Sequence, residues 1–511
     1  MRLPMIHRKQ KWISYILLFL CCAVYIFFRL EAGNAYKHPD EIIPVKVIEN
    51  ILNTGHWDTN WVLADVPKCF KYDQYNFSSY ILVSAIMVKL INPLLGILKV
   101  NTDLLISLRD FSALFHVITI LLTYAVGRSL FDSRRIGVVA VWLVAVFPLL
   151  FQDSLYGRPE SFVAMLTLLL VLLAARQCRK PEIPGFLVMG GLIGFLVASK
   201  ITFLTLFALP CIVGFLRRKE IRGIYMQLIG VLGIGLGIGF VLGVPYALVN
   251  WSSYLSGLAR LFSQYAGEHR PHGLPEGNIL ERLMYSWRYF SAIGAGGFIL
   301  LAVSGWLLLL KEKQYAHFFI VGLFFLAVAY FSIKPVFFER SFSFAIPIFS
   351  ICVGFVIFWC IDRLRSNQII RMLLLSVIIA AVTAPLIFFL WKLNTQVLSG
   401  RYVKQCQELR TKLQNQYGVP IKISGWIMDD FKYEWFSDQL SEDKQDTIYE
   451  IYGANDIYTR HYISLAIKKL GMRVIAERPS PFQANDLPPS TLYTYHAPQL
   501  FYLTRASSPS Q

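Results

Sequence analysis

Charged side chains are scarce in this sequence. Asp, Glu, Lys and Arg make up only 16% of its 511 residues, and 55% are hydrophobic, whereas a soluble globular protein carries roughly 25% charged residues. Apolar runs recur from residue 13 to residue 391, and each is close to the length that crosses a bilayer core of about 30 Å. The composition therefore excludes an ordinary soluble domain and predicts an all-α, multi-pass membrane protein.

Cysteine is also scarce, and it is not spaced like a metal site. None of the intervals matches those of cysteine metal ligands. Only Cys69 and Cys406 fall in segments expected on the outer side of the membrane, and whether they form a disulfide stays open. Most of the eight cysteines lie in apolar runs, where cysteine behaves as a small hydrophobe: Cys21, Cys22, Cys211, Cys352 and Cys360.

The net charge of +17 would suit a protein that binds nucleic acid, but the placement of the basic residues argues against this function. Lys and Arg form short clusters between apolar runs, which is the pattern of cytoplasmic loops in membrane proteins. Met1–Lys11 precedes the first apolar run and resembles the start of a signal peptide, yet no small-residue cleavage site follows that run. We expect an uncleaved first helix with a cytoplasmic N-terminus.

The basic clusters also predict the topology, because the chain must cross the membrane an even number of times between them. The result is about eleven spans, with outer loops at 31–79 and 249–287. The stretch 80–98 would lie along the outer surface as a juxtamembrane helix. The expected spans are 13–28, 110–127, 136–152, 161–176, 184–199, 201–216, 226–248, 288–310, 315–333, 342–361 and 370–391.

Residues 400–511 break the apolar pattern and predict a small α/β domain outside the membrane, after a transmembrane part at 1–399. Their hydrophobic spacing predicts two helices and three strands. The expected helices are 401–417 and 456–470, and the expected strands are 420–426, 472–476 and 500–504.

The unusual polar residues gather in turns expected on the outer side. Asp40 and Glu41 give the strongest signal, because two acids beside a membrane helix are costly unless they face water or a polar substrate. Channels and transporters tend to carry their charges near mid-membrane, whereas here the helix centres hold few. The further candidates are His38, Arg158, Glu160, Lys200, His269, Arg270, His272 and Arg340.

Each candidate also has a plainer interpretation, which the sequence leaves open. Asp40 or Glu41 would cap the helix expected at 42–52. Arg158 would anchor the membrane interface in a pair with Glu160. Lys200 and Arg340 would likewise anchor the membrane interface. His38, His269 and His272 would be solvated side chains.

Carboxylates combined with several cations fit one reaction in particular. Transfer of a sugar from a polyprenyl phosphate needs a carboxylate near the acceptor hydroxyl, to take or orient its proton. It also needs cations to neutralise the phosphate leaving group, and the planar fork of arginine bonds two phosphate oxygens at once. We therefore expect the adjacent acids Asp40 and Glu41 to supply the base or orienting group.

Several segments, taken in order, resemble one family. The segments are His38-Pro39-Asp40-Glu41, Asn53-Thr54-Gly55-His56-Trp57, Tyr156-Gly157-Arg158-Pro159-Glu160, Gly243-Val244-Pro245-Tyr246 and Phe338-Glu339-Arg340. They are similar to the bacterial GT-C glycosyltransferases related to protein O-mannosyltransferases and lipid A aminoarabinose transferase, over roughly residues 12–391. The resemblance implies a GT-C fold, an inverting transfer, a polyprenyl-phosphate sugar donor and a catalytic role for Asp40, with Glu41 supporting it or binding the sugar.

One departure from the family concerns the donor phosphate. The aminoarabinose transferases carry a Lys-Pro pair before the juxtamembrane helix, where this chain has Tyr75-Asn76. This departure leaves the ligand of the donor phosphate open. The expected phosphate and substrate contacts are Arg340, Arg158, Lys200 and Arg270. The His-Pro-Asp-Glu string also resembles mannosyltransferases of lipid-linked oligosaccharide and glycolipid-anchor synthesis, which keeps an enzyme of the endoplasmic reticulum as an alternative.

The sequence thus leads to one hypothesis and two rivals. The hypothesis is a glycosyltransferase of the plasma (inner) membrane, with a polyprenyl-phosphate-linked sugar, a lipid, glycan or protein acceptor and the bilayer as partners, and no nucleic acid. It requires no cofactor, and a divalent cation at Asp40 and Glu41 stays an alternative. The rivals are a transporter or flippase of lipid-linked sugars and an inactive scaffold that binds through residues 400–511.

Overall fold

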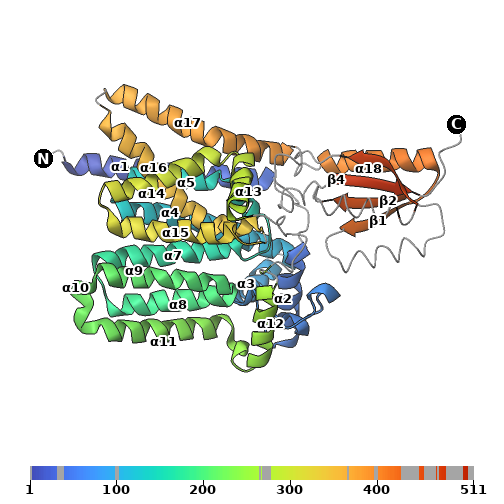
Figure 1. Cartoon of the computed structure of the whole chain (residues 1–511), viewed down its shortest axis with the longest axis horizontal. Helices are drawn as coiled ribbons and strands as arrows, with labels where there is room; N and C mark the ends of the chain where they lie inside the picture. Colours follow the sequence, from blue (N-terminus) through green and yellow to red (C-terminus); the bar gives the residue numbers. More distant parts are fainter. Residues whose placement is uncertain are drawn as a thin grey trace.

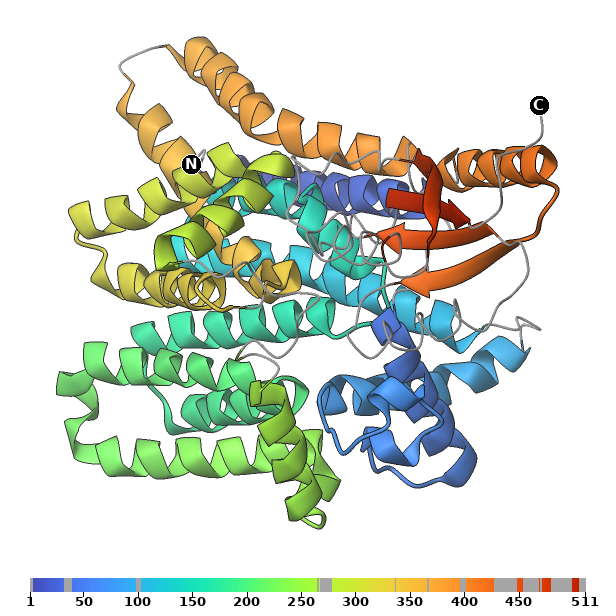
Figure 2. The same cartoon turned by 45° about the vertical axis from the view of Figure 1, so that its right-hand side comes forward.

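A bundle of long helices makes up most of the computed structural model (Figure 1). The helix α1 (Leu3–Glu31) begins at one end of the bundle, and a small β-sheet lies beyond the other end, an arrangement that Figure 2 shows from a second direction. The described residues are 3–31, 39–97, 103–263, 266, 278–335, 337–364, 367–395, 401–426, 448–453, 468, 471–478 and 499–504.

Long apolar helices confirm a multi-pass membrane protein. Seven helices among the described residues are long and apolar enough to cross a membrane, and nine if each of two bent pairs counts as one span. The seven are Trp12–Leu30 in α1, α4 (Leu104–Phe131), α7 (Glu160–Arg179), Arg218–Gly243, which contains α10 (Arg218–Ile221) and α11 (Tyr225–Gly243), α15 (Tyr315–Ser332), Glu339–Arg363, which contains η9 (Glu339–Ala345) and α16 (Ile346–Arg363), and α17 (Gln368–Leu393).

The count stays below the expected eleven because two expected spans are short. The helix α8 (Ile183–Ser199) has 17 residues, and a helix of that size is about 26 Å long, less than a bilayer core of about 30 Å. The next expected span begins as the 3-10 helix η4 (Ile201–Phe207) and continues as α9 (Ala208–Leu216). Lys200 lies between the two short segments.

Two other expected spans are broken. The helices α5 (Arg134–Ala145) and α6 (Pro148–Ser154) meet at 62°, because Pro148 starts a new helix after Phe147. The helices α13 (Ile279–Ala292) and α14 (Gly296–Lys311) meet at 117°, so that α13 runs crosswise to the bundle (Figure 1). The span expected over 288–310 is therefore bent, with its first residues in α13 and the rest in α14.

Glycine allows the tightest helix contact in the bundle, between α8 and α11. A Cβ atom at Gly190 would lie 2.3 Å from the carbonyl oxygen of Leu232, and one at Gly239 would lie 1.9 Å from that of Gly191. Small residues let membrane helices approach until their backbones touch. This contact fixes α8, and with it the position of Lys200 at its end.

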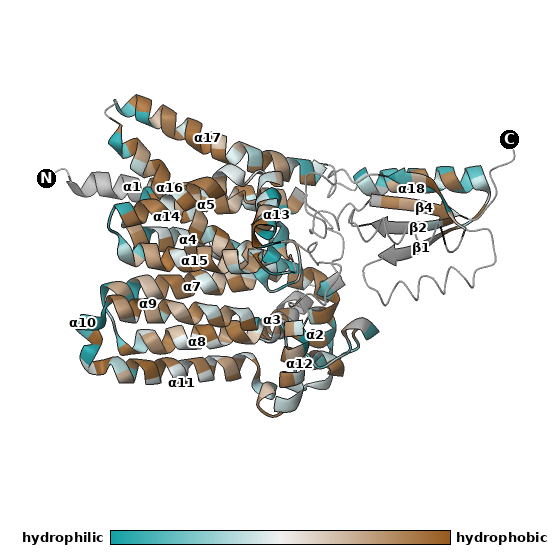
Figure 3. Cartoon of the chain, in the orientation of Figure 1, coloured by the Kyte–Doolittle hydropathy of each residue, from teal (hydrophilic) through white to brown (hydrophobic). Residues whose placement is uncertain are grey.

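The basic clusters meet at one end of the bundle. Arg179 donates a hydrogen bond to the carbonyl oxygen of Ser129, and Arg217 donates to that of Cys178. Arg363 pairs with Glu312 at 2.9 Å. Hydrophilic residues mark this end around α10 in Figure 3. The contacts agree with the expected alternation of spans and leave the opposite end for the polar candidates.

The last span is followed by α18 (Arg401–Tyr417) and a four-stranded sheet. The strands are β1 (Ile421–Trp426), β2 (Ile448–Gly453), β3 (Arg473–Arg478) and β4 (Gln499–Thr504), in the order β1-β2-β4-β3, with β1 parallel to β2 and the other neighbours antiparallel.

The sequence pattern located the helix and three of these strands but not β2. The expected helix at 456–470 lies outside the described residues, except for Lys468. Cys406 is a buried thiol on α18, and the side chain of Cys69 lies outside the described part, so the disulfide gains no support. The division at residue 400 stays a prediction.

Candidate active site

A chain of ion pairs crosses the end of the bundle opposite the basic clusters. Arg340 Nη1 donates to Asp40 Oδ2 at 3.1 Å, and Arg158 Nη2 lies 3.7 Å from the same oxygen. Arg158 Nη2 also lies 3.2 Å from Glu160 Oε1, which accepts a hydrogen bond from Lys200 Nζ at 2.7 Å. Cations and carboxylates therefore alternate, and each charge faces one of opposite sign, as burial requires.

Segments far apart in the chain supply these side chains. Asp40 lies in the short 3-10 helix η1 (Pro39–Glu41). Glu160 begins α7, where the positive end of the helix dipole stabilises an acid. Arg340 lies in η9, and Lys200 is an extended residue between α8 and η4. The structure thus brings together five of the residues that the sequence singled out.

Exposure divides these five side chains into two groups. Asp40 is 22% exposed, Arg340 19% and Lys200 16%, whereas Arg158 and Glu160 are 1% and 2% exposed. The first three side chains reach solvent, and the other two are buried between them. Arg158 does pair with Glu160, as the anchor alternative required, but the pair is buried rather than interfacial.

Glu41 is held by a different set of groups. Arg109 Nε donates to Glu41 Oε1 at 2.8 Å and Arg109 Nη2 to Oε2 at 2.7 Å, and the N–H of Gly157 donates to Oε1 at 2.8 Å. Glu41 precedes α2 (Ile42–Thr54), but its side chain makes no capping hydrogen bond. The capping alternative is therefore wrong for Glu41, and this geometry favours a positioning role over the expected catalytic one.

Two residues at this end were not expected from the sequence. Arg109 directly precedes an expected span, and an arginine is common at the end of a membrane helix. Asp153 in α6 is 3% exposed, and Ser343 of η9 donates a hydrogen bond to it. An acid at the end of an apolar run is a functional signal, so Asp153 could have been found. No spacing in the sequence connects Arg109 with Glu41.

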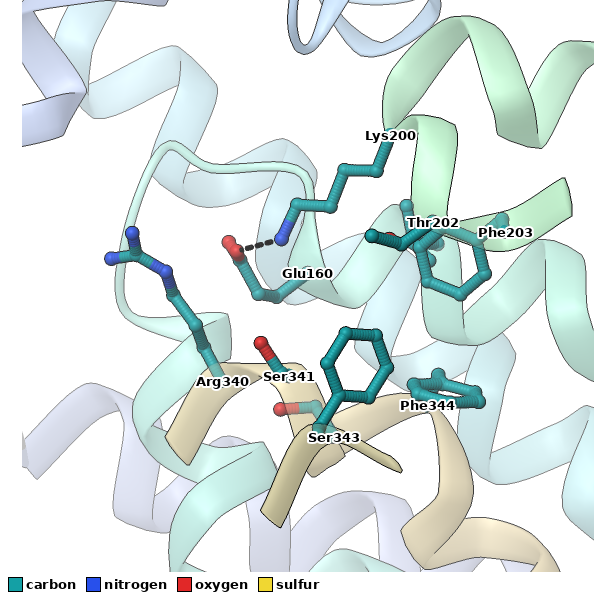
Figure 4. A pocket seen from close by; sticks show the side chains of 10 residues that line it. Glu160, Lys200, Thr202, Phe203, Arg340, Ser341, Ser343 and Phe344 are labelled. Carbon is teal, nitrogen blue, oxygen red and sulfur yellow. Dashed lines mark hydrogen bonds and ion pairs between the residues drawn. The ribbon is translucent and has the colours of Figure 1, made fainter. Parts of the chain in front are cut away.

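A cavity of about 340 Å³, which includes space open to solvent, borders the chain of ion pairs (Figure 4). Lys200 and Arg340 approach Glu160 from two sides, and Ser341 and Ser343 lie beside Arg340. Apolar side chains line the rest of the cavity, namely Val163, Phe203, Phe331 and Phe344. Cations beside aromatic rings suit an anion attached to an apolar chain.

Burial and neighbouring charges oppose each other at the two inner cations. Burial disfavours the charge of Arg158, but Glu160 and Asp40 outweigh burial and raise its pKa above the ordinary value. Burial lowers the pKa of Lys200, with Glu160 opposing this effect and Arg340 adding to it. Lys200 is therefore the cation whose charge responds more readily to alkaline pH.

Four expected site residues lie outside the described part of the chain, so their roles stay predictions. They are His38, His269, Arg270 and His272.

The described residues contain no group of three or more His, Cys, Asp and Glu side chains that could hold a metal ion. Asp40 faces two arginines, and Glu41 accepts a bidentate bond from Arg109. A divalent cation would have to displace these partners, because it needs the same carboxylate oxygens. The alternative of a cation at Asp40 and Glu41 stays a prediction.

Comparison with known families gives a partial sequence match. Residues 85–246 match a family model described as dolichyl-phosphate-mannose-protein mannosyltransferase. Comparison with curated proteins gave no significant match.

The fold resembles those of two solved membrane proteins. ArnT from Cupriavidus metallidurans, bound to undecaprenyl phosphate, has a TM-score of 0.53 at 13% identity, covering 98% of this chain and 99% of that one. The apo form of the same ArnT gives a TM-score of 0.52 at 13% identity, and the comparison covers 99% of this chain and 100% of that one. The oligosaccharyltransferase AglB from Archaeoglobus fulgidus, in complex with an inhibitory peptide and a dolichol-phosphate, gives 0.50 at 13% identity, with 94% and 72% covered.

The sequence match and the fold point the same way. The matched segment contains Arg109, Arg158, Glu160 and Lys200, and the shared fold extends over nearly the whole chain. Both agree with the resemblance carried by the Asp40 segment. The chain therefore has the GT-C fold of these membrane proteins, and residues 85–246 are similar to the mannosyltransferase family.

Proposed function

We propose that this glycosyltransferase moves a sugar from a polyprenyl-phosphate carrier to a hydroxyl group of a lipid, glycan or protein acceptor. The observation that carries the proposal is the partly exposed carboxylate of Asp40 beside Arg340, which lines a cavity together with Lys200 and Glu160. Structures with the same fold that hold undecaprenyl phosphate and a dolichol-phosphate support a donor of this class.

In the proposed step, Asp40 takes or orients the proton of the acceptor hydroxyl, and the hydroxyl oxygen forms a bond to the anomeric carbon of the sugar. The bond from that carbon to the phosphate oxygen breaks, and its electron pair leaves with the polyprenyl phosphate. Arg340 and Lys200 stabilise the negative charge that develops there. Attack from the side opposite the leaving group inverts the anomeric configuration.

The remaining residues keep this arrangement in place. Arg158 and Glu160 are buried, and they join Asp40 to Lys200 without reaching solvent. Glu41 and Arg109 tie η1 to the turn at Gly157. Such preorganisation matters because charges that are already oriented need no rearrangement when the reaction occurs.

We propose that the N-terminus is cytoplasmic and that the site faces the outside of the plasma (inner) membrane. The basic clusters at the opposite end of the bundle support this orientation. Residues 400–511 would then form an extracytoplasmic domain, because the sheet lies beyond the end opposite the start of α1 (Figure 1). We assign them to acceptor recognition and residues 1–399 to catalysis.

The direct test is transfer from a labelled polyprenyl-phosphate sugar by membranes that contain the Asp40→Asn variant. We expect transfer to fall by about 100-fold or more, since general-base catalysis contributes about 10²–10⁴-fold, with thermal unfolding little changed. The matched control is Asp110→Asn, because Asp110 is 68% exposed and pairs weakly with Arg29 at 3.8 Å. Full activity in Asp40→Asn would remove Asp40 from the mechanism.

Mass spectrometry of surface glycans and glycolipids, with and without the protein, separates the rivals. A glycosyltransferase leaves an acceptor without one sugar, whereas a flippase leaves its lipid-linked sugar on the cytoplasmic side. A defect in lipid-linked oligosaccharides or glycolipid anchors would favour the alternative in the endoplasmic reticulum. No altered glycan at all would contradict the proposal.

A further inference from the structure

Phe77 has a backbone conformation that is rare for an aromatic residue. Its φ is +72°, in the left-handed region that favours glycine. Two other described non-glycine residues have positive φ, Asp132 and Lys313, and both are polar residues at the ends of helices. A bulky residue keeps such a conformation only when its surroundings fix it, which is characteristic of functional sites.

Contacts on both sides hold the backbone of Phe77. Its N–H donates to the carbonyl oxygen of Ser199 at 2.8 Å. The indole N–H of Trp61 donates to the carbonyl oxygen of Asn76 at 3.2 Å. The rings of Trp61 and Phe77 pack with their centroids 5.9 Å apart, and Phe77 is buried. The first outer loop is therefore fastened to the end of α8.

This arrangement places the ring of Phe77 against Lys200. Lys200 Nζ lies 5.8 Å from the ring centroid, on the face of the ring, and it donates to Glu160 at 2.7 Å. Because Ser199 directly precedes Lys200, one segment holds both the backbone and the ammonium group of this lysine. An aromatic face attracts a cation and keeps water away from it.

We propose that Phe77 is a positioning residue that holds the ammonium group of Lys200 at the cavity, where the phosphate of the donor binds. The inference rests on the proposed function and adds the residue that keeps this cation in place. Charged groups also face Lys200 from other elements: Glu160 from α7, Arg158 from the turn before α7 and Arg340 from η9. A substitution at Phe77 leaves all three unchanged.

The decisive variant is Phe77→Leu in the full-length protein. It keeps an apolar, buried side chain and the same backbone strain, and it removes the aromatic face. We measure binding of undecaprenyl phosphate, and the donor KM and kcat, from about pH 7 to about pH 10. We expect the donor KM to rise about three- to tenfold with kcat nearly unchanged. The alkaline loss of binding should move to lower pH by about half a unit to one unit.

Two further variants separate positioning from packing. Phe77→Tyr keeps the ring and should retain the wild-type pH profile. Phe355→Leu removes a buried ring at the opposite end of the bundle, where Phe355 stacks on Phe131 at 4.8 Å, and it should leave donor binding unchanged. If Phe77→Leu loses only as much stability as Phe355→Leu and keeps the wild-type KM and pH profile, the inference is overturned.

The binding measurement also separates this inference from the proposed function. If the wild type binds undecaprenyl phosphate but transfers no sugar, the proposed function fails, and the shifted binding profile of Phe77→Leu still supports the positioning role. If transfer occurs and the Phe77→Leu profile is unshifted, only the inference fails.

Discussion

Arg340 Nη1 donates to Asp40 Oδ2 at 3.1 Å, although 300 residues separate the two in the chain. Both side chains are partly exposed, and Arg340 lines the cavity that Lys200 also lines. The contact holds the carboxylate that we assign to the acceptor hydroxyl beside a cation that we assign to the donor phosphate. Sugar transfer needs these two groups on either side of one anomeric carbon, so a donor that binds between them replaces this contact.

Replacement of Arg340 should weaken the use of the donor. We expect kcat/KM for the donor to fall about 10- to 100-fold in Arg340→Ala, since a hydrogen bond to a charged group contributes about 1.5–3 kcal/mol. Arg340→Lys should be intermediate, because an ammonium group lacks the planar fork. Steady-state kinetics measure the effect, with Arg288→Lys on the exposed face of α13 as the control. Equal kinetics for all three variants would show that Arg340 does not contact the donor.

Removal of either partner of the Glu41–Arg109 pair should lower the stability of the fold and not only the rate of sugar transfer. The pair is buried and bidentate, and removal of one partner of a buried pair costs about 3–5 kcal/mol. Glu41→Gln and Arg109→Met should therefore each lower the unfolding temperature in detergent, and the double variant should lose less than the sum. If both single variants unfold like the wild type, Glu41 is again a candidate for a group that takes part in the reaction.

The affinity for the donor should fall as the pH rises. The fall should occur below the pH at which an ordinary lysine loses its proton. Burial lowers the pKa of Lys200, and only the protonated amine attracts phosphate. Affinity should thus be complete below the lowered pKa and be lost as pH rises through it. The unfolded chain keeps this proton up to about pH 10.4, so the contribution of Lys200 to folding stability should rise over the same window.

Titration of undecaprenyl phosphate binding against pH measures this effect. The matched variant Lys200→Arg stays charged throughout and should show no alkaline loss. If the wild type and Lys200→Arg lose affinity in parallel, another group is responsible.

The contact between α8 and α11 should tolerate no added methyl group. In Gly239→Ala the new Cβ would lie 1.9 Å from the carbonyl oxygen of Gly191, whereas a Cβ at Gly233 on the same helix meets nothing within 4 Å. We expect Gly239→Ala to lose about 1–3 kcal/mol through overpacking and Gly233→Ala to unfold like the wild type. Thermal unfolding in detergent compares the two, and equal curves would mean that the helices lie further apart.

Removal of divalent cations should leave sugar transfer intact. The carboxylates of Asp40 and Glu41 already face arginines, which disfavour a second cation at the same oxygens. We expect a chelator followed by gel filtration to leave kcat unchanged. Activity that is lost and then restored by one added metal would instead support the cation alternative.

Much of the fold was predictable from the sequence because lipid imposes simple rules. Apolar runs and basic clusters gave most of the spans and their alternation. The differences concern residues 136–152, 184–216 and 288–310, where helix length and continuity depend on packing against neighbours. The break before Pro148 illustrates this, since a proline can either start a helix or kink one, and hydropathy does not distinguish the two.

The candidate site was predictable in part for a similar reason. Asp40, Arg158, Lys200 and Arg340 stood out because charges near membrane helices are costly. Arg109 did not, because an arginine at the edge of an apolar run is ordinary. Its importance appears only when α4 brings it to Glu41.

The sequence by itself determined that the chain crosses a membrane repeatedly and which charged residues need an explanation, because hydropathy and charge act locally. The tertiary structure decided the partner of each charge. It left Asp40, Arg340 and Lys200 partly exposed and buried Arg158, Glu160 and Glu41. The physical reason is that exposure and ion pairing depend on contacts between segments hundreds of residues apart, which no local pattern records.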